Sequence, residues 1–176
     1  MKRVMRISVS PVKGFRLSHP EQVALGRDGV ADNRRFFLVG ADGQRLRSSL
    51  TRWPVLVRAE YDADGEVLRM RFPNGSEVEG DAHGNGATVQ STAGTLDVTG
   101  RVVEGPWEGP LSRLAGNAVR LVRAGRSADG MHAAVTLVSD GSLARLAEVA
   151  GRAHVDARRF RMLFEVAECE PHEEDT

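Results

Sequence analysis

The chain has 176 residues with 24 basic and 24 acidic side chains, so its formal net charge is zero. Balanced charge argues against a general nucleic-acid-binding protein, which normally carries a basic excess. No apolar run approaches the roughly twenty residues that span a bilayer, and the charged start MKRVMRISVSP lacks the apolar core of a secretion signal. The single cysteine, Cys169, has no internal disulfide partner. We therefore expect a cytoplasmic protein without nucleic-acid or membrane partners.

The first hundred residues are predicted to form short strands separated by tight turns. Residues 3–10 alternate, with Met5, Ile7 and Val9 on one face, which is the period of a half-buried strand. Further strands are predicted in RRFFLVG (34–40), WPVLVRAEY (53–61) and EVLRMRF (66–72). Hairpin-type Asp-Gly or Asn-Gly pairs separate them at 28–29, 42–43, 64–65 and 74–75.

The second part of the chain combines loops, two helices and further strands. The Gly-rich stretch 79–96 is predicted to be a loop, and EGPWEGP (104–110) marks a junction. A short helix is expected to end near Gly116 before a strand, and a longer helix is expected from Ser139, its N-cap, to Gly151. Its apolar stripe, read as core packing, comprises Leu143, Leu146, Ala147 and Ala150. Residues 155–168 are predicted to return to strand through three clustered arginines.

One lysine stands out in this pattern. Lys2 and Lys13 are the only lysines among the basic side chains, and Lys13 lies in SPVKGF (10–15), between a Pro-Val pair and a glycine. A compact ammonium and a planar guanidinium do different chemistry, so the choice of lysine here is informative. The alternative is a solvated turn lysine without a ligand.

Several of these segments resemble the MOSC proteins, named for the molybdenum cofactor sulfurase C-terminal domain, and occur in the family's order. They are similar in particular to two-part members with an N-terminal β-barrel, such as the amidoxime-reducing components. The matching segments are Pro11-Val12-Lys13-Gly14, Arg35-Phe36-Phe37-Leu38-Val39, Ala41-Asp42-Gly43, LSRLAGNAVRLVR, AVTLVSDGSLARL and VDARRFR.

The resemblance implies a mainly β fold with short helices (α+β). A small N-terminal MOSC β-barrel-like domain would span residues 1–108, and an incomplete MOSC β-barrel would span residues 109–176. A barrel that lacks strands exposes unpaired edges, so a homodimer that pairs those edges is a further expectation.

The resemblance also implies that the protein binds the molybdenum cofactor (molybdopterin), an anionic pterin with a phosphate. Matched residue by residue, Lys13, Arg35 and Arg161 are the expected cofactor contacts, because a point charge and bidentate guanidinium groups suit phosphate. Ser139 is a further expected donor, with plain helix capping as the favoured alternative. Arg34 and Arg159 are expected to be surface or supporting charges.

In such a family the reaction would be the reduction of N-oxygenated compounds, with electrons from a redox partner protein. Two kinds of departure weaken that expectation: replaced residues, and a metal-ligating cysteine that is expected only beyond the sequence. Met162 and Leu163 follow Arg161 where the family commonly has Pro-Asn, and Gly14 replaces a serine found in several relatives. The metal-ligating cysteine of the family is expected beyond Thr176, and Cys169, flanked by glutamates, does not match it.

Several alternatives follow from these departures. Three explanations are open: the chain is a shortened form of a full enzyme, it is a short homologue that has lost the enzymatic activity, or another chain completes its second barrel. Functionally, the alternative is a non-catalytic module that binds an anion, a pterin or a protein. A Schiff-base role of Lys13 with pyridoxal phosphate is disfavoured, because such a lysine is usually desolvated. No metal site is expected from the scattered histidines, and the acidic end from Glu168 is expected to be either disordered or part of the second domain.

Overall fold

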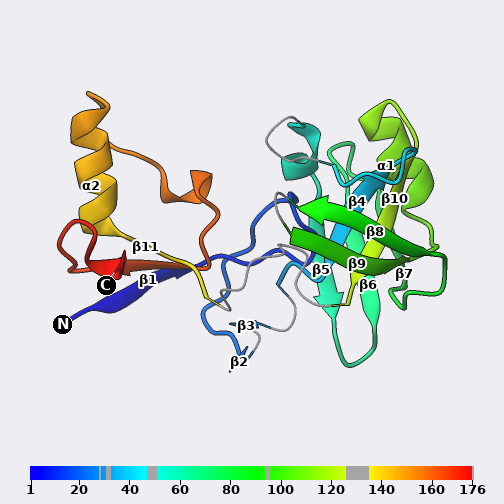
Figure 1. Ribbon diagram of the computed structural model, residues 1–176, viewed down its shortest axis with the longest axis horizontal. Coiled ribbons are helices and arrows are strands. Elements are labelled where there is room, and N and C mark those ends of the chain that lie inside the picture. The colour runs from blue at the N-terminus through cyan, green and yellow to red at the C-terminus, as the bar shows by residue number, and fades with distance from the viewer. Residues whose placement is uncertain (28, 31–32, 47–50, 94–95, 126–134, 176) are drawn as a thin grey trace. The chain divides into compact units, whose positions relative to one another are not determined.

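The computed structural model describes residues 1–27, 29–30, 33–46, 51–93, 96–125 and 135–175. These residues form mainly strands, together with two α-helices and short 3-10 turns (Figure 1), which confirms the predicted fold class. The chain divides into two compact units. We call Ser10–Leu17 with Val30–His132 the core unit, and Met1–Val9, Ser18–Gly29 and Ala133–Thr176 the terminal unit.

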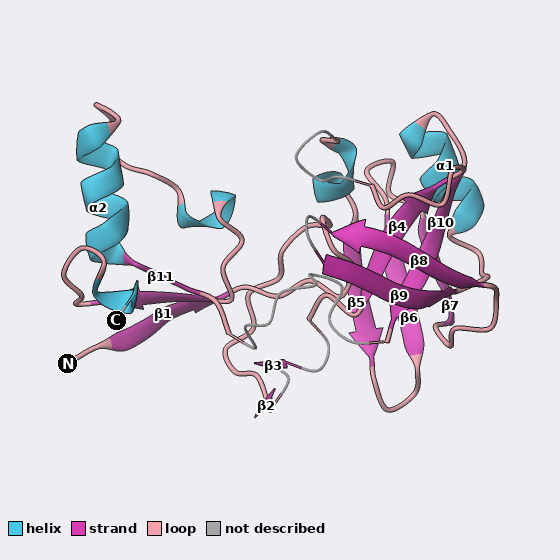
Figure 2. Ribbon diagram, viewed as in Figure 1, coloured by secondary structure: helices cyan, strands magenta, loops and turns pink. Residues whose placement is uncertain are grey.

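The core unit contains two antiparallel sheets. The first has the order β4 (Phe36–Gly40), β10 (Val119–Ala124), β9 (Leu96–Val102), β8 (Thr88–Ala93). The second has the order β5 (Arg58–Asp62), β6 (Val67–Arg71), β7 (Glu77–Asp81). The remaining elements are α1 (Glu108–Ala115) and the 3-10 helix η1 (Trp53–Leu56), and Figure 2 shows how strands dominate this unit.

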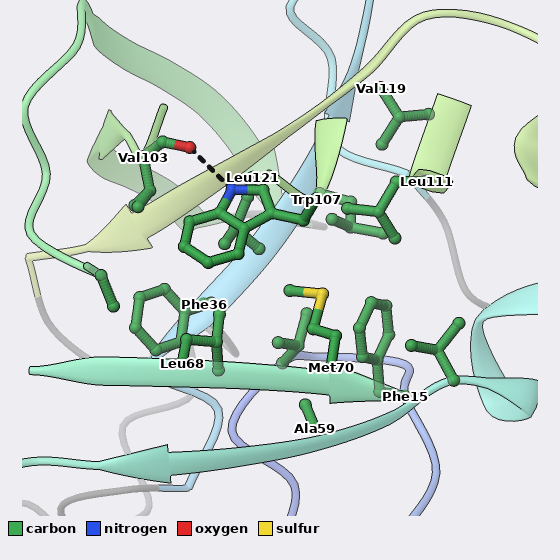
Figure 3. Packing of buried hydrophobic residues seen from close by; sticks show 14 of the residues in the cluster. Phe15, Phe36, Ala59, Leu68, Met70, Val103, Trp107, Leu111, Val119 and Leu121 are labelled. Carbon is green, nitrogen blue, oxygen red and sulfur yellow. Dashed lines mark hydrogen bonds between the residues drawn. The ribbon is translucent and has the colours of Figure 1, made fainter. Parts of the chain in front are cut away.

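A large apolar cluster fills the core unit (Figure 3). The predicted alternation of β6 is confirmed, because Leu68 and Met70 are fully buried while Arg69 and Arg71 are exposed. The indole of Trp107 lies in the same cluster, and its Nε1 donates a hydrogen bond to the Val103 carbonyl at 3.0 Å. That bond satisfies the polar atom of an otherwise apolar side chain.

The predicted turns at 42–43, 64–65 and 74–75 follow β4, β5 and β6. Gly43 and Gly75 take positive φ values of 74° and 84°, which glycine adopts without steric cost. In the β5–β6 hairpin the positive φ falls instead on Glu66, at 51°, and not on the preceding Gly65. The pair at residues 28–29 lies partly outside the described residues.

Two segments of the core unit differ from the prediction. Residues 53–56 form η1, with Pro54 in its first turn, so the strand begins only at Arg58. Much of the predicted loop 79–96 belongs instead to β7, β8 and β9. The alternation of β8 was hidden because Ser91, a polar residue, occupies a buried position, where its hydroxyl accepts the Arg45 amide at 2.9 Å.

The terminal unit is built on a three-stranded sheet of order β1 (Arg3–Ile7), β12 (Phe164–Ala167), β11 (Leu137–Ser139). The helix α2 (Asp140–Val149) follows β11 directly, and the 3-10 turns are η2 (Ala157–Arg159) and η3 (Glu173–Asp175). Its buried apolar cluster consists of Val138, Leu143 and Ala157. The short strands β2 (Leu25–Gly26) and β3 (Gly29–Val30) form a separate ladder.

Four expectations for the terminal unit were wrong in detail. Met5 is 55% exposed, so the apolar face of β1 is not buried as predicted, and Leu146 of α2 is 41% exposed. The clustered arginines lie in and after η2, because Asp156 caps that turn, and the strand starts only at Phe164. The acidic end, expected as disordered in one alternative, contains η3 and is hydrogen-bonded to α2.

The two helix predictions are confirmed. Gly116 ends α1 with a φ of 73°, and the Ser139 hydroxyl accepts the Ser142 amide as the N-cap of α2. The domain boundary predicted at residue 108 does not coincide with the division into compact units. α1 and β10 follow that boundary but belong to the core unit, whereas β1 precedes it and belongs to the terminal unit. Among the described helices, none has the length and apolar character needed to cross a membrane.

Candidate functional site

Residues 10–15, which we call the lysine turn, are fixed by hydrogen bonds on both sides of Lys13. The Ser10 hydroxyl donates to the Val12 carbonyl at 2.9 Å, and the Phe15 amide donates to the same carbonyl at 3.1 Å. Gly14 is buried with a φ of 91°, a conformation that L-residues rarely adopt. Lys13 is therefore presented, partly buried, from a rigid turn.

The same turn is paired with the start of β4, next to Arg35. The Lys13 amide donates to the Phe36 carbonyl at 2.8 Å, and the Phe36 amide donates to the Pro11 carbonyl at 2.9 Å. These two bonds make Val12 and Phe36 a parallel bridge. The structure thus brings the predicted residues Lys13 and Arg35, far apart in sequence, to neighbouring positions in the core unit.

Arg34, expected to be a supporting charge, contributes backbone to this arrangement. Its amide donates to the Ser10 carbonyl at 2.7 Å, and its φ is 54°. A non-glycine residue in the left-handed region is strained by roughly 1–2 kcal/mol. Residues with such strain concentrate at functional sites. The contacts around Arg34 therefore hold the backbone in this conformation where the lysine turn meets β4.

Arg161 belongs to the terminal unit and follows η2. The Asp156 carboxylate accepts the Arg158 amide at 3.0 Å and binds the Arg158 guanidinium, whose hydrogen bonds lower the pKa of Asp156 to about 2. Arg158 is thus neutralised locally, and Arg159 is exposed. Burial lowers the pKa of Arg161, whose φ is 55°. Among these arginines, Arg161 is the desolvated one.

Ser139 is fully buried and its hydroxyl is engaged on both sides. It accepts the Ser142 amide at 3.1 Å and donates to the Glu174 carboxylate at 2.7 Å. The capping role that the sequence favoured is present. The cofactor contact expected for Ser139 stays a prediction, as it does for Lys13, Arg35 and Arg161.

A polar cluster near Arg35 was missed by the sequence reasoning. The Arg123 guanidinium binds both carboxylate oxygens of Glu66, one of them at 2.6 Å, and the Tyr61 hydroxyl donates to Glu66 at 2.6 Å. Burial and the hydrogen bond to Glu66 raise the pKa of Tyr61 to about 12, while the charge of Arg35 acts on it in the opposite direction. Glu66 and Arg123 are 57 positions apart, so only the folded chain reveals the cluster.

Metal-binding chemistry has little support among the described side chains. No group of three or more His, Cys, Asp or Glu residues in the described ranges is arranged to hold a metal ion. Partial burial and the nearby Glu173 carboxylate raise the pKa of the Cys169 thiol. A raised pKa disfavours the thiolate that ligates metals.

The comparisons with known proteins include a family match and a similar solved structure. No curated protein matches the chain. The solution structure of a protein from Bordetella bronchiseptica is similar to the chain, with 17% sequence identity and a TM-score of 0.42, over 52% of this chain and 72% of that one. A family model described as the MOSC N-terminal beta barrel domain matches residues 1–106, which include Lys13 and Arg35. The chain therefore belongs to the family of proteins with a MOSC N-terminal beta barrel domain.

Proposed function

We propose that the protein binds the molybdenum cofactor through cationic side chains and forms part of an oxidoreductase that reduces N-oxygenated compounds. One observation carries the proposal: the lysine turn is hydrogen-bonded to the Arg35–Phe36 segment, within the stretch that matches the family model. Two cationic residues on hydrogen-bonded backbone segments suit an anionic pterin with a phosphate.

The chain's residues fit the anionic part of this cofactor. Lys13 offers a compact ammonium, and Arg35 and Arg161 offer planar guanidinium groups that bind phosphate in a bidentate manner. Arg161 is already partly desolvated, so a charged ligand there would meet a lower dielectric and a stronger attraction. In the proposal Ser139 adds a hydroxyl donor.

The described residues do not fit the metal itself. Cys169 has a raised pKa, and its Sγ lies 3.7 Å from the Ala167 carbonyl oxygen. We therefore assign no metal ligand and derive no reaction step at molybdenum. In this proposal, the electron donor and the ligand to the metal come from outside the described residues.

The test is to produce the protein in cells that synthesise the cofactor and to measure bound pterin and molybdenum. We expect bound pterin in the wild type and at least a roughly tenfold weaker retention in Lys13→Ala and Arg35→Ala, since each removes a charge-assisted contact. Arg16→Ala is the matched control, because Arg16 is an exposed cation next to the same turn. Equal pterin in all four proteins would contradict the proposal.

A second candidate function is a non-catalytic module that binds an anionic ligand. The observation that favours it is the packing of the residues that replace the family's Pro-Asn: Leu163 is 3% exposed and Met162 packs against the apolar cluster of the terminal unit. These side chains stabilise the fold and offer no polar contact. Bound pterin without molybdenum, in protein from cells supplied with molybdate, would favour this candidate over the enzyme.

A further inference from the structure

Residues 168–175 lie against the start of α2 and are held there by side chains of that helix. The Glu168 and Cys169 amides donate to the Asp140 carboxylate at 2.9 and 3.2 Å, and the His172 amide donates to the Ser142 hydroxyl at 2.8 Å. We call residues 168–175 the acidic segment.

A further contact of the acidic segment with the helix start is made by Glu174. Its carboxylate accepts the Ser139 amide at 3.0 Å and the Ser139 hydroxyl at 2.7 Å. Burial raises the pKa of Glu174, but hydrogen bonds from Ser139 and Ser142 outweigh it and lower the pKa from 4.5 to about 2. The carboxylate is therefore fully charged at neutral pH, and its contribution to stability is lost as the pH falls from 4.5 through about 2.

Close packing at Gly141 shows that the acidic segment fits this place tightly. A Cβ atom at position 141 would collide with the Cys169 carbonyl oxygen and lie 2.7 Å from the Glu170 carbonyl carbon. Both are backbone atoms, so the acidic segment itself must shift to admit a side chain. Glycine is needed here for space, since its φ is not in the left-handed region.

The acidic segment is also held from the N-terminal strand. Lys2 forms an ion pair with Glu173, and the Met1 amino group binds Glu168 at 2.6 Å, with Arg3 at 3.8 Å from the same carboxylate. Asp140 also faces the acidic segment, and within the segment the His172 Nδ1 lies 3.6 Å from an Asp175 carboxylate oxygen. The acidic segment is therefore held both by cations from the start of the chain and by hydrogen-bonding groups at the start of α2.

We propose that the acidic segment is an autoinhibitory latch, which keeps the Ser139 hydroxyl on Glu174 and away from the cofactor until the segment is released. This rests on the proposed function, in which Ser139 contacts the cofactor. The hydroxyl has one proton, and in the latched state that proton is donated to Glu174. A ligand that binds the Ser139 hydroxyl must therefore shift the acidic segment toward its released state. By linkage, release of the acidic segment raises the affinity for that ligand by the same factor.

Amide hydrogen exchange at neutral pH tests the latch without any ligand. We expect the Cys169 and His172 amides to exchange about tenfold faster or more in Glu174→Gln, which loses a charge-assisted hydrogen bond. Gly141→Ala should give the same result by a steric route. The control is Glu170→Gln, an exposed carboxylate in the same segment. Unchanged exchange in both Glu174→Gln and Gly141→Ala, with α2 intact, would overturn the latch.

Pterin content in protein from cofactor-producing cells tests the inhibition. We expect Glu174→Gln to retain several times more pterin than the wild type and Glu170→Gln to match the wild type. A pterin content in Glu174→Gln equal to or below that of the wild type would overturn the inhibition, since the acidic segment would then have no effect on cofactor binding or would promote it. Absence of pterin from every variant would overturn both the inhibition and the proposed function. The exchange measurement would still show whether the latch exists, so the two failures are distinguishable.

Discussion

Positive backbone φ values occur at several residues that make specific contacts in the structure. Among the described non-glycine residues, the left-handed region holds Arg34, Glu66, Arg161, Glu168 and His172. Arg34 adjoins the lysine turn, Glu66 binds Arg123, and Glu168 and His172 belong to the acidic segment. Such strain persists only where surrounding contacts over-determine the conformation. These positions are poor sites for neutral substitution, although no local sequence pattern marks them.

Tyr61 provides a residue-scale prediction because it is the only tyrosine in the chain. Its pKa is raised to about 12, so the folded protein favours the neutral phenol, and this contribution to stability is lost as the pH rises from 10 to about 12. Ultraviolet absorbance of the phenolate should show a titration midpoint well above the ordinary value in the wild type. Glu66→Gln should lower that midpoint, since it removes the charged hydrogen-bond acceptor.

The control for Tyr61 is Glu60→Gln, which removes an exposed carboxylate from the adjacent position of β5. Its midpoint should match the wild type. A wild-type midpoint at the ordinary value for tyrosine, with circular dichroism showing a folded protein, would contradict the hydrogen bond between Tyr61 and Glu66.

At the scale of elements, strands with clear alternation were predictable and strands with polar buried positions were not. β6 was predicted from Leu68 and Met70, which alternate with arginines. β8 was missed because Ser91 occupies a buried position where an apolar residue was expected. α2 was predictable because its cap, Ser139, is local in sequence. The pair formed by Glu66 and Arg123 was not, because it joins the β5–β6 hairpin to β10 of the other sheet.

Gly100 in β9 gives an element-scale prediction. A Cβ there would collide with the Arg123 carbonyl oxygen, so Gly100→Ala must separate β9 from β10. We expect a loss of about 1–3 kcal/mol in the free energy of unfolding, the usual cost of overpacking, measured by urea unfolding.

The matched control for Gly100 is Gly125→Ala, directly after β10, where the nearest atom is the Thr99 carbonyl oxygen at an ordinary contact distance of 3.6 Å. That change should alter the free energy of unfolding by no more than about 0.5 kcal/mol. Equal effects of the two substitutions would contradict the close approach of β9 to β10 at position 100.

At the scale of the whole molecule, the four residues predicted to contact the cofactor belong to two different units. Lys13 and Arg35 were brought together by strand pairing, whereas Arg161 and Ser139 belong to the terminal unit. The sequence resemblance supplied all four residues, but it did not indicate that the Ser139 hydroxyl is bound to Glu174. That contact joins positions 35 residues apart through an ordinary glutamate, so no local pattern signals it.

The two units differ in core size, which predicts different stabilities. Fully buried Leu121 lies in the large cluster of the core unit, which also contains both tryptophans, Trp53 and Trp107. Leu121→Ala should destabilise this unit by about 2–5 kcal/mol, measured by tryptophan fluorescence in urea. The amides of β12 should keep their exchange rates.

The control for Leu121 is Leu146→Ala in α2, where the side chain is 41% exposed. It should leave the tryptophan transition unchanged, because neither tryptophan belongs to the terminal unit. If Leu121→Ala both lowered the urea midpoint of tryptophan fluorescence and accelerated amide exchange in β12, the two units would instead unfold as one cooperative unit.

The pairing of β1 with β12 has a consequence for how the protein is made. Arg3 lies opposite Ala167, so β1 gains this neighbour only after residue 167 has been made. Residues 10–132 contain all that the core unit needs and are available earlier, and domains generally fold as units during synthesis. Nascent chains arrested before residue 164 should therefore already protect Trp107, while residues 1–9 stay open to proteases.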